Sequence, residues 1–107
     1  MAPAFEAATV HGDGQVVVSV SGELDIATAD QLWQAIETAT QRSRRLVIDL
    51  SRTTFIDSTG LSVLVRAHRR LGGAPEALTL RGPSALARKV LDISGISQMV
   101  TIEPSAT

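Results

Sequence analysis

The chain contains no cysteine among its 107 residues, which excludes disulfide bonds and thiolate chemistry and fits a reducing compartment. Its aromatic side chains are few, namely Phe5, Trp33 and Phe55. Proteins that bind single-stranded nucleic acid stack bases on exposed rings, so a chain with so few rings has little to offer such a ligand.

An excess of charge of one sign is also missing. Ten basic and eleven acidic residues give a formal charge of −1, so no overall field attracts nucleic acid or an anionic membrane. No apolar run approaches the roughly 20 residues of a membrane-spanning helix. The first four residues lack the basic start and apolar stretch of a signal peptide. We therefore expect a cytoplasmic monomer with neither a membrane nor a nucleic acid as its direct partner.

The chain instead carries alternating strand and helix patterns. A length of 107 residues suffices for one hydrophobic core, so we expect a single domain over residues 1–107, with 1–4 and 104–107 as loose ends. Short apolar runs predict strands, and apolar residues spaced by three and four predict helices. The expected order is β-β-α-β-α-β-α-β. The expected strands span 5–10, 15–21, 46–50, 78–81 and 98–103, and the expected helices span about 28–42, 58–71 and 84–94.

Each expected helix has an apolar stripe that should face the core. Thr28 and Gln31 have the spacing of a capping box at the start of the first helix. The expected stripes are Leu32, Ile36 and Ala39 in the first helix, Leu61, Leu64, Val65, His68 and Leu71 in the second, and Leu86, Val90 and Ile93 in the third.

These patterns predict an α/β fold with a mixed, mostly parallel sheet and covering helices. The first two strands should form an antiparallel hairpin, and strands separated by single helices should be parallel through right-handed crossovers. The helices then begin at the C-terminal ends of the strands, where α/β proteins usually bind. Asp25, Asp30 and Asp57 lie near helix starts and arginines within 42–45 and 66–70 lie near helix ends, so this pole should be acidic.

Ser58 is the main candidate residue, because it stands where the second helix should begin. Asp57, Ser58 and Thr59 are all residue types that cap helices, and from spacing alone capping is the favoured interpretation. The alternative is that Ser58 accepts a phosphate, because a helix N-terminus tolerates a dianion without melting. The sequence leaves both interpretations open.

A second candidate segment is residues 22–25 (Gly-Glu-Leu-Asp), between the second strand and the first helix. Glycine and acidic residues are common in such connections, so a turn with a capping group is the favoured interpretation. The segment gains interest because the crossover argument places Asp25 at the same pole as Asp57 and Ser58.

Catalytic, metal and cofactor sites find little support. A serine hydrolase needs Gly-x-Ser-x-Gly around its nucleophile, and this pattern is absent at Ser58. The two histidines, His11 and His68, cannot be placed beside Ser58 from the sequence. No histidine or carboxylate pair has a metal-ligand spacing. We therefore expect no catalytic residue, no metal ligand and no cofactor.

Three segments resemble the STAS domain family, in particular the bacterial anti-sigma factor antagonists. The first is residues 22–25 followed by Thr28 and Ala29. The second, residues 47–61, contains Phe-Ile-Asp-Ser-Thr-Gly-Leu and is the most specific. The third is residues 83–96. Together they span most of the chain in the order of the family.

The resemblance implies a non-enzymatic domain that binds a serine-kinase anti-sigma factor and thereby frees the sigma factor. It implies that the kinase phosphorylates Ser58 and inactivates the antagonist, and that a serine phosphatase restores it. It further implies a surface that receives the kinase. The residues implied at this surface are Glu23, Leu24, Asp25, Asp57, Ser58, Thr59 and Gly60.

Two alternatives remain from the sequence. The chain could be a scaffold subunit of a larger assembly, such as a lipid-transport or stress-sensing complex, in which Ser58 is incidental. It could also be a small hydrolase, which would require a histidine near the Ser58 hydroxyl.

Overall fold

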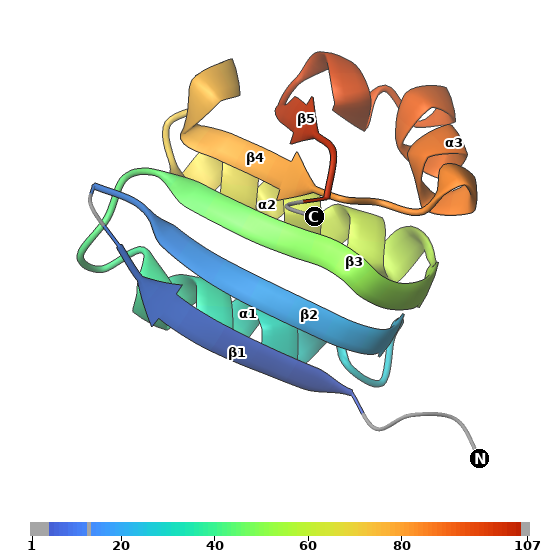
Figure 1. The fold of residues 1–107 in the computed structure, drawn as a ribbon, viewed down its shortest axis with the longest axis horizontal. Helices are drawn as coiled ribbons and strands as arrows, with labels where there is room; N and C mark the ends of the chain where they lie inside the picture. The colour runs from blue at the N-terminus through green and yellow to red at the C-terminus, as the bar shows by residue number, and fades with distance from the viewer. Residues whose placement is uncertain (1–4, 13, 106–107) are drawn as a thin grey trace.

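A computed structural model of the chain describes residues 5–12 and 14–105 (Figure 1). Asp13 of the expected hairpin turn and the expected loose residues 1–4 and 106–107 lie outside the described part. Short 3₁₀ turns occur at Pro75–Ala77 and Ile96–Gln98. The strands are β1 (Glu6–His11), β2 (Val16–Leu24), β3 (Leu46–Ile56), β4 (Leu78–Arg81) and β5 (Thr101–Glu103), and the helices are α1 (Ala29–Ala39), α2 (Ser58–Arg70) and α3 (Ala85–Ile93).

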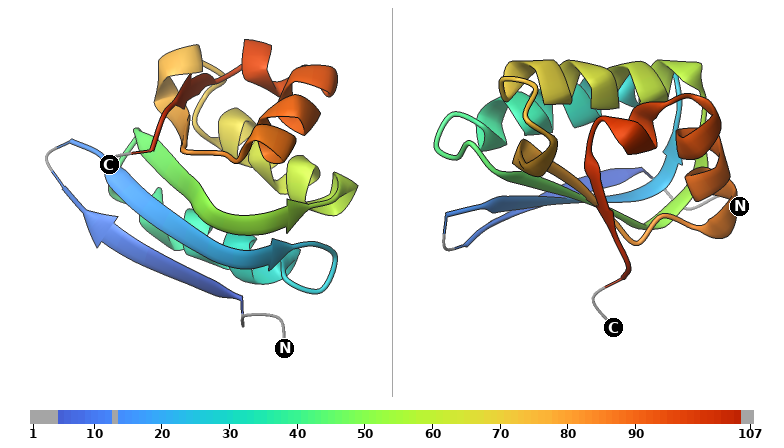
Figure 2. Two further views of the ribbon diagram at one scale, coloured as in Figure 1. Left: turned by 45° about the vertical axis from the view of Figure 1, so that its right-hand side comes forward. Right: turned by 90° about the horizontal axis from the view of Figure 1, so that it is seen from above.

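The five strands form one sheet in the order β1-β2-β3-β4-β5. β1 and β2 are antiparallel, and each later neighbour pair is parallel. The predicted α/β class and mixed sheet are therefore confirmed. Because every crossover moves one strand further in the same direction, right-handed connections put the helices on one side of the sheet. Figure 2 shows α1 and α2 covering that side, while the other face of the sheet stays open.

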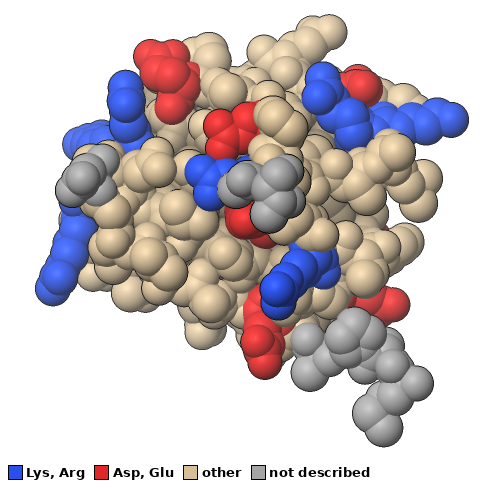
Figure 3. All heavy atoms as spheres, viewed as in Figure 1, with Lys and Arg blue, Asp and Glu red and all other residues tan. Residues whose placement is uncertain are grey.

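The burial of β2 follows from this one-sided cover. Its residues alternate between fully buried positions, such as Val16 and Val18, and exposed or half-buried ones, such as Ser19. This is the pattern of a sheet with one wet face. Figure 3 views the open face, where Lys and Arg side chains gather at the edge from which β3 starts. Arg44 and Arg45 immediately precede β3.

The buried stripe of α1 was predicted correctly. Leu32, Ile36 and Ala39 are each 0% exposed and pack on the sheet. In α2 the expected stripe is confirmed in part: Leu64, His68 and Leu71 are buried, whereas Leu61 and Val65 are only half-buried. Val63 and Ala67, which the stripe did not include, are buried as well. Gly60 lets the start of α2 approach Leu24 of β2 closely, which a count of large apolar residues could not reveal.

Two strands are longer than the sequence predicted. β2 continues to Leu24 rather than ending at residue 21, and β3 continues to Ile56 rather than ending at residue 50. The two extensions pair with each other, with bulges near Ser21 and Gly22, where φ is +91°. Thr53 is buried and its hydroxyl donates to the Val20 carbonyl at 3.1 Å. This long-range pairing overrides the local polarity of the sequence.

The predicted capping box of α1 was wrong, and so was its expected end. Thr28 occupies the N-cap, but its side chain makes no capping hydrogen bond to α1. The helix ends at Ala39, and the Thr40 hydroxyl donates back to the Ile36 carbonyl at 2.7 Å. No arginine lies in the last turn of α1. Arg70 of α2 instead reaches that end, with its Nε 2.7 Å from the Thr40 hydroxyl.

The stripe predicted for α3 was also wrong. Leu86 and Ile93 are 69% and 77% exposed, and Leu91 is the one buried residue of this helix. α3 lies beyond the end of β4 rather than flat across the sheet (Figures 1 and 2), so only a narrow side of it reaches the core. β5 is likewise shorter than expected, because residues 96–98 form a 3₁₀ turn.

Candidate functional site

The C-terminal ends of β2 and β3 lie side by side. Leu24 is paired with Ile56 in the parallel register, and the Asp57 amide donates to the Leu24 carbonyl at 3.1 Å. The chain therefore leaves both strands at one pole, with Asp25 next to Asp57 and Ser58. The shared position of these three residues was predicted from the crossovers and is confirmed.

Asp57 makes the cap of α2. Its backbone is extended, and its carboxylate accepts a hydrogen bond from the Gly60 amide at 3.0 Å. The Asp57 carbonyl also accepts from the Leu61 amide at 3.0 Å. The capping interpretation thus holds for Asp57, whose carboxylate satisfies an N–H group that a helix start leaves unpaired.

Ser58 is consequently the first residue of α2 and not its cap. Its side chain is exposed, and its hydroxyl makes no hydrogen bond to any residue that the structure describes. Only its carbonyl is engaged, by the Ser62 hydroxyl at 3.0 Å. The fold therefore leaves this hydroxyl at the surface and available for chemistry.

The contact between Gly60 and Leu24 holds the start of α2 against the end of β2. A Cβ atom on Gly60 would lie 2.7 Å from Leu24 Cγ and 2.9 Å from the Leu24 carbonyl oxygen, so only glycine allows this approach. Leu24 is 0% exposed, and Gly60 is buried. Among the residues predicted at the partner surface, these two are therefore buried in the free protein and position their neighbours.

The turn after β2 is built by its own side chains. The Asp25 carboxylate accepts from the Ala27 amide at 3.0 Å. The Thr28 hydroxyl donates to the Glu23 carbonyl at 2.8 Å and accepts from the Asp25 amide at 3.0 Å. Asp25 is half-buried and Glu23 is exposed, so Glu23 offers the freer carboxylate to a partner.

The pole is acidic, as expected. Exposed Glu23 and Asp30 lie there with half-buried Asp25 and Asp57, and the first turns of α1 and α2 contain no basic residue. The two ion pairs between described residues, Arg81–Glu103 and Arg88–Asp92, belong to other parts of the chain. A phosphate on Ser58 would be favoured by the helix N-terminus and opposed by these carboxylates.

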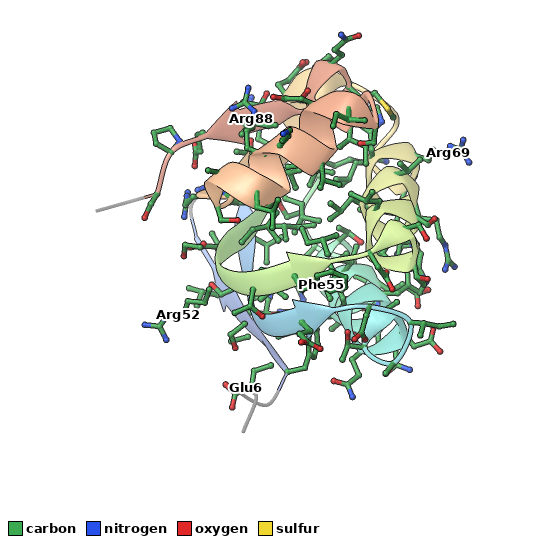
Figure 4. The ribbon with its side chains drawn as sticks, turned by 90° about the vertical axis from the view of Figure 1, so that its right-hand side faces the viewer. Glu6, Arg52, Phe55, Arg69 and Arg88 are labelled. Atoms are coloured by element: carbon green, nitrogen blue, oxygen red, sulfur yellow. The ribbon has the colours of Figure 1, made fainter. Side chains whose placement is uncertain are left out.

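An apolar groove lies beside the phosphate-accepting candidate and was not predicted. It measures about 210 Å³, and Phe55 and Ile56 of β3 face Leu86, Ala87 and Val90 of α3 across it. We call it the β3–α3 groove. Figure 4 looks onto this end of the molecule, with Phe55 labelled on β3 and α3 above it. Two residues of the stripe expected to face the core, Leu86 and Val90, line this groove instead.

The structure supports neither a hydrolase site nor a metal site among the residues that it describes. His11 ends β1 at the opposite pole. His68 lies in the last turn of α2, about 15 Å along the helix from Ser58, and is 8% exposed. Neither histidine can serve Ser58 as a base. The described residues contain no cluster of three or more histidines and carboxylates that could hold a metal.

Within the same residues, no helix has the length and hydropathy to cross a membrane.

Comparison with known proteins gives one family. The model described as "Mlab, STAS domain" matches residues 7–101. The anti-sigma-B factor antagonist of Listeria monocytogenes is 33% identical over 87 residues, covering 80% of this chain and 76% of that protein. The crystal structure of an anti-sigma factor antagonist from Mycobacterium paratuberculosis superimposes with a TM-score of 0.80 at 34% identity, covering 96% of this chain and 88% of that one.

The fold also matches SpoIIAA, an anti-sigma factor antagonist solved in two states. Its unphosphorylated form superimposes with a TM-score of 0.74 at 27% identity, covering 92% of this chain and 87% of SpoIIAA. The phosphorylated form of SpoIIAA from Bacillus gives a TM-score of 0.69 at the same identity, covering 92% and 90%. The chain therefore resembles a protein, SpoIIAA, whose structure is known with and without a phosphate.

Proposed function

The chain belongs to the STAS domain family, and from this premise we propose that it is an anti-sigma factor antagonist. As a single cytoplasmic domain, it binds a serine-kinase anti-sigma factor and so releases the sigma factor. The same kinase phosphorylates Ser58 and ends the interaction, and a serine phosphatase restores it. The protein itself performs no catalysis and uses no cofactor.

One observation carries the proposal, namely the free hydroxyl of Ser58 at the first position of α2. Because Asp57 provides the cap, a phosphate on Ser58 removes no hydrogen bond that the fold uses. The exposed position leaves room for a kinase. The likeness to SpoIIAA, which has been solved in unphosphorylated and phosphorylated forms, supports the same assignment.

Electrostatics explain how a phosphate would prevent binding without refolding the protein. Phosphorylation adds about −1.5 to −2 charges next to Asp57 and at the same pole as Asp25 and Glu23. The N-terminus of α2 stabilises a negative charge at an exposed site by only about 0.3–1 kcal/mol. Burying the uncompensated charge under a partner costs several kcal/mol, and every 1.4 kcal/mol is tenfold in affinity. A partner whose surface fits the neutral serine therefore no longer binds after phosphorylation.

The direct test is phosphorylation in vitro. The protein is incubated with ATP and each candidate serine kinase from the same genome, and mass spectrometry locates any phosphate. We expect one kinase to place a single phosphate on Ser58, the Ser58→Ala variant to stay unmodified, and a serine phosphatase to reverse the reaction. Stable modification at another residue, or of the variant as well, would contradict the proposal.

A second candidate is a scaffold subunit of a larger assembly. The observation in its favour is that the matching family model carries the description "Mlab, STAS domain", which does not mention an antagonist. Affinity purification of the tagged protein from its own cells separates the two candidates. Recovery of an ATP-dependent serine kinase supports the antagonist, whereas recovery of transporter subunits supports the scaffold.

A further inference from the structure

The β3–α3 groove is an exposed apolar feature that the switch at Ser58 does not explain. Phe55 is 51% exposed and Leu86 is 69% exposed, although large apolar side chains of this kind are usually buried. Exposed apolar surface that is rimmed by polar residues marks sites of interaction. The groove volume of about 210 Å³ exceeds the roughly 150 Å³ of an engineered cavity that holds benzene, so one large apolar side chain fits.

The groove is formed before any partner arrives, because α3 is fixed in place. Leu91 anchors the helix in the core with 0% exposure, and the Ser84 hydroxyl caps it by accepting from the Ala87 amide at 3.1 Å. The Ser97 side chain, and then the Arg88 guanidinium, hold the pKa of Asp92 below its ordinary value through hydrogen bonds. The Ser84 cap and the Arg88–Asp92 pair stabilise the helix itself, and the contact of Asp92 with Ser97 ties its C-terminal end to the 3₁₀ turn at Ile96–Gln98.

The groove is continuous with the Ser58 surface. Phe55 and Ile56 form one wall and are followed directly by Asp57 and Ser58. A protein that covers Ser58 therefore also lies against the groove. The carboxylates of Glu23, Asp25 and Asp57 lie on the Ser58 side of the groove and complement a basic protein surface there. On the α3 side, Arg88 is paired with Asp92 and Lys89 is exposed.

We infer that the β3–α3 groove is the anchoring part of the surface that receives the anti-sigma kinase, and that it holds an apolar side chain of the kinase flanked by basic residues. This inference rests on the proposed function, because it takes the kinase as the occupant. Binding then has two separate parts. The groove supplies affinity in either state of the protein, and Ser58 supplies the phosphate-dependent loss.

A separate anchor has a kinetic signature. The groove holds the substrate protein but touches none of the reacting atoms at Ser58. Weakening it raises the KM for phosphorylation of Ser58 and leaves kcat nearly unchanged. A change that only distorted the Ser58 turn would lower kcat as well.

The experiment uses neutral substitutions, so that no charge effect enters. Leu86→Ser and Phe55→Ser remove apolar surface from opposite walls, and Val10→Ser is the control. Val10 is 64% exposed on β1 at the opposite pole. Calorimetric titration with the kinase should show at least tenfold weaker binding for each groove variant and less than twofold change for the control. The KM for phosphorylation should rise by a similar factor, while thermal melting confirms that each variant is folded.

The outcomes separate this inference from the proposed function. If the wild type is bound and phosphorylated at Ser58 while both groove variants bind like the wild type, the groove inference fails and the proposed function stands. If the kinase neither binds nor phosphorylates the wild type, both fail together. If sedimentation shows a self-association that Leu86→Ser abolishes, the occupant is a second copy of the chain, and the inference is likewise overturned.

Discussion

The N-termini of α2 and α3 are capped in the same way, but only one of them leaves a serine hydroxyl unbonded. Each helix begins directly after a strand connection, and each has a cap whose side chain accepts from the amide of the third helical residue. At α3 the cap is Ser84, so its hydroxyl is already engaged in a hydrogen bond from the Ala87 amide. At α2 the cap is Asp57, and the serine stands one position later with a free hydroxyl. A serine near a helix start is thus available for modification only when another residue provides the cap.

The third helical residues differ as well. Ala87 of α3 borders the β3–α3 groove, whereas Gly60 of α2 is pressed against Leu24. The tight packing at α2 holds its first turn rigidly beside the turn after β2. The start of α2 is therefore a fixed platform for an exposed hydroxyl, and the start of α3 is one wall of a groove.

The largest expected effect comes from a charge at the free hydroxyl. Ser58→Asp should weaken kinase binding about a hundredfold, equivalent to about 2.8 kcal/mol, because the kinase surface must bury an unpaired carboxylate. Calorimetric titration measures it. Gln41→Glu, which adds the same charge at an exposed residue beyond the end of α1, should change the affinity less than twofold. Equal affinities for Ser58→Asp and the wild type would rule out charge exclusion.

The next effect concerns the packing that distinguishes the two helix starts. Gly60→Ala places a methyl group within 3 Å of Leu24 and should lower the free energy of unfolding by about 1–3 kcal/mol. In a domain of this size each kcal/mol lowers the Tm by about 4–8 °C. Gly12→Ala is the matched control, because its methyl group would meet only the Gln15 carbonyl at 3.9 Å. Identical thermal melts for the two variants would show that the approach of α2 to β2 is not tight.

A smaller effect tests the comparison of the serines themselves. Ser84→Ala removes a capping hydroxyl and should reduce the free energy of unfolding by about 1 kcal/mol. Ser58→Ala removes an unbonded hydroxyl and should change it by less than about 0.5 kcal/mol. Urea unfolding measures both. If Ser58→Ala proved as costly as Ser84→Ala, the Ser58 hydroxyl would have a structural role after all.

The smallest effect concerns the two helix dipoles. Ala85→Asp puts a carboxylate at the first position of α3 and should raise the free energy of unfolding by about 0.3–1 kcal/mol at low salt. Ser58→Asp puts one at the first position of α2, but there the neighbouring Asp57 repels it, so the gain should be close to zero. Urea unfolding at low and high salt should show the first gain shrinking as the charges are screened. A larger gain at Ser58 would mean that the pole is less acidic than its residues indicate.

The sequence predicted the placement of the site because that placement follows from connectivity. Parallel strands joined by right-handed crossovers bring Asp25, Asp57 and Ser58 to one pole whatever the details of packing. The sequence could not decide whether Asp57 or Ser58 caps α2, since both residue types cap well. Only the hydrogen bond from Gly60 to Asp57 separates the two interpretations.

The elements that were wrong depended on contacts between distant segments. β3 runs past Leu50 because it pairs with the end of β2, and no local pattern reports such pairing. The stripe of α3 was recognised as apolar, but periodicity does not say whether an apolar face meets the core or the solvent. Leu86 thus passes for an ordinary core residue until the position of α3 is known.

A phosphate on Ser58 is expected to prevent binding without altering the fold. The most direct measurement is a calorimetric titration of the kinase with unmodified protein and with protein phosphorylated only at Ser58, alongside circular dichroism of both forms. We predict that the phosphorylated form binds at least a hundredfold more weakly while its spectrum stays the same. Equal affinity of the two forms, or a loss of binding that accompanies unfolding, would contradict the account.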